Sequence, residues 1–139
     1  MQSAAILIVK AKSSGQPWND KLFDLRVEDH VDPISELSRL VQLQRAYMLM
    51  NDGDAFVSKN QWEKALKSYS RAAGLAPQIV ELPYWHAVAL VNGGRMQEAL
   101  PIFKEVFRRE PKWRDAARRL AKVKQLPNDE ATLKLIEEQ

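Results

Sequence analysis

The chain contains no cysteine, which excludes a disulfide framework and any metal site built on thiolates, and which leaves the cellular compartment open. Its two histidines, His30 and His86, lie far apart in the sequence. A metal ion needs three or four ligands at workable spacing. We therefore expect no metal and no cofactor.

Long hydrophobic runs are also missing. No segment approaches the roughly 20 apolar residues that cross a membrane. The apolar segment 4–9 is shorter than the roughly 7–15 residues of a signal-peptide core, and no small-residue cleavage site follows it cleanly. We expect a cytoplasmic protein that does not bind membranes, with a periplasmic or cell-wall location as the alternative.

Neither sign of charge dominates, since 21 lysines and arginines face 18 aspartates and glutamates and the net charge is only +3. Basic residues gather between Arg108 and Lys124, where an anion or nucleic-acid patch is one interpretation. Apart from Trp113, however, no aromatic residues alternate with them for stacking on bases. We interpret this segment as a solvated closing helix and do not expect a nucleic-acid partner.

Catalytic motifs are absent as well. The sequence has no G-x-S-x-G, no P-loop, no G-x-G-x-x-G and no Ser–His–Asp grouping. We interpret Asp29, His30 and Asp32 as a helix cap with a hydrogen-bonded histidine, and the pair Asp52 and Asp54 as solvated carboxylates. The chain by itself is therefore not expected to be an enzyme.

What the sequence does contain is a repeat between residues 46 and 113. The residues that correspond at an offset of 34 are Ala65 and Ala99, Tyr69 and Phe103, Pro77 and Pro111, Gly53 and Ala87, Asn60 and Gly94, and Trp62 and Met96. Small side chains let two helix backbones approach, large ones fill the remaining space, and the prolines end each unit because proline cannot continue a helix. The pattern predicts two successive helical hairpins.

A period of 34 residues resembles the tetratricopeptide repeat. The family pattern corresponds here to Gly53, Phe56, Ala65, Tyr69, Ala72 and Pro77, and then to Ala87, Leu90, Ala99, Phe103, Val106 and Pro111. Two departures stand out: Leu49 occupies the usual early aromatic position, and the second repeat has Pro83 there, with Trp85 shifted. The resemblance implies the fold and leaves the ligand open, because repeat arrays bind many partners.

The apolar spacing predicts a mostly α-helical domain over residues 32–139. Asp32 and Pro33 begin a long helix that we expect to run to about Ser58 with Gly53 inside it; a break at Asp52 is the alternative. Pro101 predicts a mild kink or a helix that starts late. The remaining helices are expected at 61–75, 79–91, 95–109, 113–124 and 130–138, the last two closing the array.

Residues 1–31 predict a β-hairpin, with strands at 2–11 and 21–28 and turn-forming residues at 13–20. The first strand is apolar on both faces, and a lone two-stranded hairpin is marginal in water. The hairpin is therefore either a fragment of a larger sheet or an arm through which two copies form a homodimer, residues 2–28 building a common sheet.

The segments QSAAILIVK and DLRVEDHVDP, followed by the helical pair, also give the whole chain a resemblance to the C-terminal part of a bacterial family. The first domain of that family resembles N-terminal-nucleophile hydrolases, and its C-terminal domain is labelled peptidoglycan-binding. The resemblance implies a hydrolase-like domain before Gln2, an accessory role for this chain, and peptidoglycan as a ligand. A glycan-binding groove would need exposed aromatics, for which Tyr84, Trp85 and Trp113 are candidates.

In tetratricopeptide folds the first helix of each repeat lines the concave face. By that resemblance the groove residues are Tyr47, Met50, Asp54, Val57, Tyr84, Val88, Asn92, Arg118 and Lys122. Their aromatic, amide and basic groups suit an extended peptide that carries a carboxylate. The function we expect is therefore a non-catalytic module for protein interaction or assembly, with glycan binding and the accessory role as alternatives.

Overall fold

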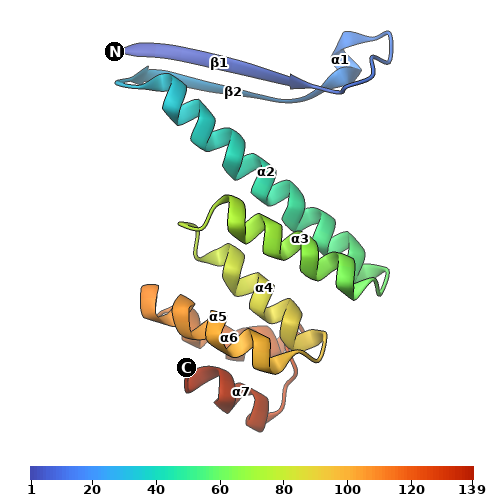
Figure 1. Cartoon of the computed structure of the whole chain (residues 1–139), viewed down its shortest axis with the longest axis vertical. Coiled ribbons are helices and arrows are strands. Elements are labelled where there is room, and N and C mark those ends of the chain that lie inside the picture. Colours follow the sequence, from blue (N-terminus) through green and yellow to red (C-terminus); the bar gives the residue numbers. More distant parts are fainter. The chain divides into compact units, whose positions relative to one another are not determined.

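The computed structural model describes residues 1–139, apart from the side chain of Pro17. The elements are β1 Gln2–Val9, α1 Pro17–Asp20, β2 Lys21–His30, α2 Pro33–Ser58, α3 Trp62–Leu75, α4 Glu81–Asn92, α5 Met96–Arg109, α6 Trp113–Lys122 and α7 Glu130–Glu137 (Figure 1). This confirms the predicted fold class, which is mostly α-helical with an antiparallel β-hairpin before the helices. The chain divides into two compact units, Met1–Arg45 and Ala46–Gln139, which are described separately.

The hairpin of the first unit has one continuous apolar face. Its register places three apolar residues of β1 opposite three of β2: Ala4 opposite Val27, Ile6 opposite Leu25 and Ile8 opposite Phe23. On β2 these residues are buried or half-buried and alternate with exposed ones, as the sequence predicts. The other face of β1 carries Leu7 and Val9, which are 56% and 51% exposed.

The loop between the strands is organised around a buried carboxylate. Asp20 accepts hydrogen bonds from the Ser13 hydroxyl at 2.9 Å and from the Ser14 backbone N–H at 2.9 Å. These hydrogen bonds, chiefly those from Ser14, lower the pKa of Asp20 because they favour its ionised form. The segment predicted as a turn thus includes one turn of helix, α1.

The start of α2 follows the predicted capping. The Asp32 carboxylate accepts a hydrogen bond from the Ser35 N–H at 3.2 Å, and Pro33 is the first helical residue. The His30 Nδ1 accepts a hydrogen bond from the Asp32 N–H at 3.0 Å. Both interpretations of this junction are confirmed, and α2 continues through Gly53 without the break considered at Asp52.

The repeat positions pack as the spacing predicts. Ala65, Ala87 and Ala99 are completely buried, and Phe103 lies at the same depth. Within the second unit α4 packs against both α3 and α5 (Figure 1). A Cβ added at Gly53 would lie 2.6 Å from the ring of Tyr69, so only glycine permits α3 to approach α2 this closely.

Three helices of the second unit end in the same backbone motif. The residues with positive φ are Asn60 after α2, Gly94 after α4 and Lys124 after α6. At each end the N–H of that residue bonds three positions back, and the following N–H bonds five positions back, in the pattern of a Schellman cap. The third cap makes α6 end at Lys122, two residues before the predicted end.

The closing helices are joined by a charged cluster. Arg118 of α6 forms ion pairs with Glu130 at 3.0 Å and Glu137 at 2.6 Å, both on α7. Asp129 caps α7 by accepting a hydrogen bond from the Thr132 N–H at 2.8 Å. In α5, Pro101 lies inside a helix that already begins at Met96, so the alternative of a late start is wrong.

Candidate functional site

The strongest candidate site is a trough along one face of α2 and α4, which we call the α2–α4 trough. It consists of two hollows of about 390 Å³ and about 270 Å³. Asp54, Trp85 and Gln125 line both hollows, so the hollows adjoin each other. The other lining residues are Tyr47, Met50, Asn51 and Glu81 in the larger hollow, and Val57, Trp62, Tyr69, Val88, Ala89, Asn92 and Lys124 in the smaller one.

The structure places six of the nine predicted groove residues along this trough: Tyr47, Met50, Asp54, Val57, Val88 and Asn92. Tyr84 lies instead in the core, fully buried, with its ring 5.6 Å from Phe103 and 4.8 Å from Trp113 between centroids. Arg118 is engaged by the carboxylates of α7, and Lys122 is exposed at the end of α6, outside the trough lining.

The helical phase of α4 explains why Trp85, and not the predicted Tyr84, lines the trough. Trp85, Val88 and Asn92 are spaced by three and four residues and share the trough face of α4, whereas Tyr84, Ala87 and Val91 are all buried. The spacing of Tyr84 to Val88 fits a common face equally well. Only packing against Phe103 and Trp113 decides between the two phases. Trp85 was expected only as an aromatic residue for glycan binding and not among the peptide-groove residues.

Two tyrosine–carboxylate pairs hold the acidic side chains of the trough. The Tyr69 hydroxyl donates to Asp54 at 2.5 Å, and the Tyr47 hydroxyl donates to Glu81 at 3.1 Å. Burial and then these hydrogen bonds raise the pKa of both tyrosines, so both hydroxyls keep their protons and act as donors. Among the described side chains, neither Asp54 nor Glu81 lies within ion-pair distance of a lysine or arginine.

Amide groups complete the trough. Asn92 donates from Nδ2 to the Gln125 carbonyl at 2.9 Å and thereby ties the end of α4 to the turn after α6. Asn51 lies exposed on α2 beside the larger hollow. The half-buried Trp85 ring therefore lies among amides, two carboxylates and a tyrosine hydroxyl. Such a surface provides both an apolar platform and hydrogen-bonding groups.

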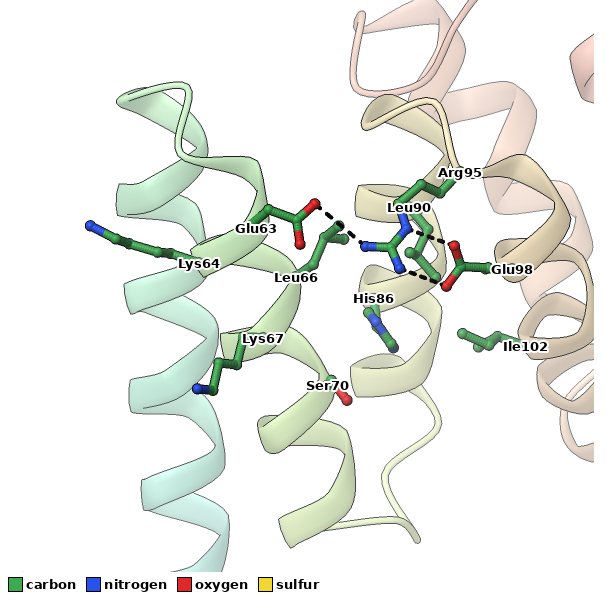
Figure 2. A pocket seen from close by; sticks show the side chains of 10 residues that line it. All are labelled: Glu63, Lys64, Leu66, Lys67, Ser70, His86, Leu90, Arg95, Glu98 and Ile102. Atoms are coloured by element: carbon green, nitrogen blue, oxygen red, sulfur yellow. Dashed lines mark hydrogen bonds and ion pairs between the residues drawn. The ribbon is translucent and has the colours of Figure 1, made fainter.

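A separate hollow of about 560 Å³, outside the α2–α4 trough, is formed by α3, α4 and α5 (Figure 2). Arg95 spans it, paired with Glu98 at 2.7 Å and with Glu63 at 3.7 Å. Burial lowers the pKa of His86, and the charge of Arg95 adds to this effect, whereas Glu98 opposes it. Figure 2 shows the ammonium ends of Lys64 and Lys67 directed away from His86. The one cation that spans the hollow already has carboxylate partners, so the α2–α4 trough is the better candidate.

The basic segment expected as a solvated closing helix carries several internal ion pairs. Arg108 pairs with Glu105 at 2.7 Å, and Lys112 pairs with Glu110 at 3.4 Å. The Arg109 guanidinium donates to the Pro77 carbonyl at 2.8 Å. These three cations have partners within the chain, whereas Arg119, Lys122 and Lys124 form no ion pair among the described residues. The interpretation as a solvated surface stays a prediction.

Within the residues that the structure describes, no helix combines the length and apolar character needed to cross a bilayer. The described side chains also contain no group of three or more His, Asp or Glu residues placed to hold a metal ion. Comparisons with protein-family models, with curated proteins and with solved structures gave no match for this chain. The proposals that follow rest on the geometry of the trough and of the hairpin.

Proposed function

We propose that the helical unit is a non-catalytic interaction module that binds a peptide, in extended form, along the α2–α4 trough. The observation that carries this proposal is that the two hollows adjoin at Asp54, Trp85 and Gln125, which line both of them. Amides such as Asn51, Asn92 and Gln125 both donate and accept hydrogen bonds, as an extended peptide backbone requires. The tetratricopeptide resemblance supports the same use of this face.

Selection from a displayed library of random linear octapeptides tests the proposal with the full chain as target. Asn51 is exposed and lines the larger hollow, so Asn51→Tyr fills the hollow without disturbing the core. Asp52→Tyr is the matched control, since it adds the same bulk at an exposed position of α2 outside the trough lining. We expect enriched peptides that bind the wild type and Asp52→Tyr but lose binding to Asn51→Tyr. Enrichment that Asn51→Tyr leaves unchanged, or no enrichment, would refute the proposal.

A second candidate ligand, a cell-wall glycan such as peptidoglycan, is favoured by the position of Trp85. A half-buried indole flanked by amides and carboxylates suits a sugar ring, whose apolar face stacks on the aromatic ring while its hydroxyls bond to the polar groups. Co-sedimentation with purified, protein-free sacculi tests this alternative. Loss of sedimentation in Asn51→Tyr but not in Asp52→Tyr would support it, and a chain that stays in the supernatant would refute it.

We further propose that the hairpin pairs with a second copy of the chain through the outer edge of β1. The strand β1 carries no charged residue from Gln2 to Val9, whereas β2 carries charges at Lys21, Asp24, Arg26, Glu28 and Asp29. Charged residues protect sheet edges from pairing, so β2 is protected and β1 is not. Two uncharged β1 strands can pair about a two-fold axis without charge repulsion, and the larger sheet avoids the marginal stability of two strands.

Size-exclusion chromatography with light scattering tests this pairing. We expect a dimer for the wild type and for Leu22→Lys, which adds a charge on the already charged β2 strand. Leu7→Lys brings two like charges together across the β1 edge and should give a monomer. A monomeric wild type would refute the pairing and would favour the hydrolase-like sheet that the family resemblance implies as the neighbour of β1.

A further inference from the structure

The larger hollow of the α2–α4 trough has an unusual balance of charge. Its lining includes the carboxylates of Asp54 and Glu81 but no lysine, arginine or histidine among the described residues. Glu81 comes from the first turn of α4, and Asp54 comes from the C-terminal half of α2, so the two carboxylates reach the hollow from different helices. The only basic residue of the trough lining, Lys124, belongs to the smaller hollow.

Glu81 is unusual among the glutamates of the second unit, because the described ion pairs engage every other glutamate there, although they engage none of its aspartates. Ion pairs engage Glu63, Glu98, Glu105, Glu110, Glu130, Glu137 and Glu138. Asp54 and Glu81 instead receive hydrogen bonds from neutral tyrosine hydroxyls, which orient the carboxylates without cancelling their charge. The hollow therefore keeps a negative potential that a bound cation would neutralise.

The Trp85 ring supplies a second, independent attraction for a cation. It is half-buried, it lines both hollows together with Asp54, and it shares the larger hollow with Glu81. An ammonium or guanidinium group within about 6 Å of an indole face is attracted by the ring quadrupole. Tyr47, which also lines this hollow, adds a second aromatic ring on the same side as Glu81.

We propose that the larger hollow is a subsite for a basic side chain, lysine or arginine, of the peptide bound in the trough. The cation lies between the carboxylates of Asp54 and Glu81 and over the Trp85 ring, and the rest of the peptide continues toward Asn92 and Lys124. This inference rests on the proposed function and replaces the expected preference for a carboxylate, because Arg118 and Lys122 do not line the trough. Lys124 marks the end at which an acidic group of the peptide is accommodated.

The test uses the strongest peptide from the octapeptide selection, its variant with the basic residue replaced by glutamine, and the chain of residues 1–139. Asp54→Asn and Glu81→Gln remove one charge each and keep an oxygen that accepts the tyrosine hydrogen bond. Asp52→Asn is the control, because it removes the same charge from an exposed position outside the trough. Dissociation constants are measured by fluorescence anisotropy at low and at physiological salt.

We expect the selected peptides to share a lysine or arginine at a fixed position. Replacing it by glutamine should weaken binding to the wild type and to Asp52→Asn about tenfold, as two exposed ion pairs and one cation–π contact suggest. In the double variant Asp54→Asn, Glu81→Gln the same replacement should change affinity less than about threefold. Higher salt should weaken only the basic peptide.

The possible outcomes separate this inference from the proposed function. Peptides that bind in the trough without a shared basic residue overturn the basic subsite and leave peptide binding intact. The basic subsite is also overturned, with peptide binding intact, if replacing the basic residue by glutamine weakens binding to the double variant as much as to Asp52→Asn. If no peptide depends on the trough, which Asn51→Tyr reveals, both proposals fail together.

Discussion

The close approach of α2 and α3 at Gly53 gives the sharpest prediction about stability. A glycine inside a helix is normally replaced by alanine with a gain of about 1 kcal/mol in the free energy of unfolding. At Gly53 the new Cβ would meet three atoms of the Tyr69 ring at 2.6, 2.8 and 2.9 Å. Tyr69 is only 5% exposed, and its hydroxyl is held by Asp54, so its ring has little room to move.

The magnitude follows from two opposing effects. Overpacking a filled site costs typically about 1–3 kcal/mol, which exceeds the gain in helix propensity when the neighbouring ring is fixed. We therefore expect Gly53→Ala to lower the free energy of unfolding by roughly 1–2 kcal/mol. Urea unfolding followed by circular dichroism at 222 nm measures this difference as a shift of the midpoint at constant slope.

Gly74 is the matched control. It also lies inside a helix, near the end of α3, but a Cβ added there meets nothing within 4 Å. Gly74→Ala should therefore stabilise the protein by up to about 1 kcal/mol. Opposite signs for the two substitutions are the expected result, and equal stabilisation by both would refute the role assigned to the Tyr69 contact.

A double substitution tests the cause directly. In a Tyr69→Ala background the ring is absent, so adding Gly53→Ala should now stabilise the protein by up to about 1 kcal/mol. The effect of the same substitution thus changes sign with its neighbour. If Gly53→Ala remains destabilising in that background, the glycine is required for a reason other than the ring of Tyr69.

Three further outcomes concern other parts of the second unit. Pro101→Ala restores a backbone donor inside α5 and should raise the free energy of unfolding by about 2 kcal/mol. The gain in helix propensity is about 3 kcal/mol, and the greater freedom of the unfolded chain without proline offsets about 1 kcal/mol of it. Lys124→Gly relieves a left-handed residue with a φ of 62° and should stabilise by roughly 0.5–1 kcal/mol in the same assay. Because the pKa of His86 is lowered in the folded chain, wild-type stability should fall as the pH drops below about 6.5, and His86→Gln should reduce that fall.

Each of these outcomes has a result that would contradict it. A Pro101→Ala chain no more stable than the wild type would mean that the missing hydrogen bond is already compensated. Loss of stability in Lys124→Gly would show that the lysine side chain contributes more than the strain costs. Parallel pH profiles for the wild type and His86→Gln would show that His86 does not cause the loss of stability at low pH. That loss would then come from protonation of the paired carboxylates.

Much of the helical architecture followed from the chain alone, because the physical causes are local or periodic. Asp32 and Pro33 determine where α2 begins, since the cap satisfies free backbone N–H groups. The offset of 34 residues placed Ala65 and Ala99 in equivalent buried positions, since a repeated packing unit needs small residues at repeated places. The alternation in β2 predicted its two faces for the same reason.

The candidate site was less accessible to such reasoning. The trough residues on α2 were expected from the tetratricopeptide resemblance, and Tyr47, Asp54 and Val57 do line the trough at spacings that share one helical face. On α4 two phases were equally consistent with the spacing, and the one that buries Tyr84 was not the one predicted. On α6, Arg118 is engaged by the carboxylates of α7 and Lys122 lies outside the trough lining. The trough is lined instead by Lys124 and Gln125 of the cap that follows α6.

The sequence by itself thus determined which segments are helices and strands and which small residues allow helices to pack, because those properties depend on neighbours within a few turns. Only the tertiary structure decided which face of α4 borders the trough and which charges are cancelled. Arg118 and Asp54 are both charged surface residues in the sequence. Folding gives Arg118 two carboxylates from α7 and gives Asp54 only a tyrosine hydroxyl, because partners distant in the chain meet only once the helices have packed.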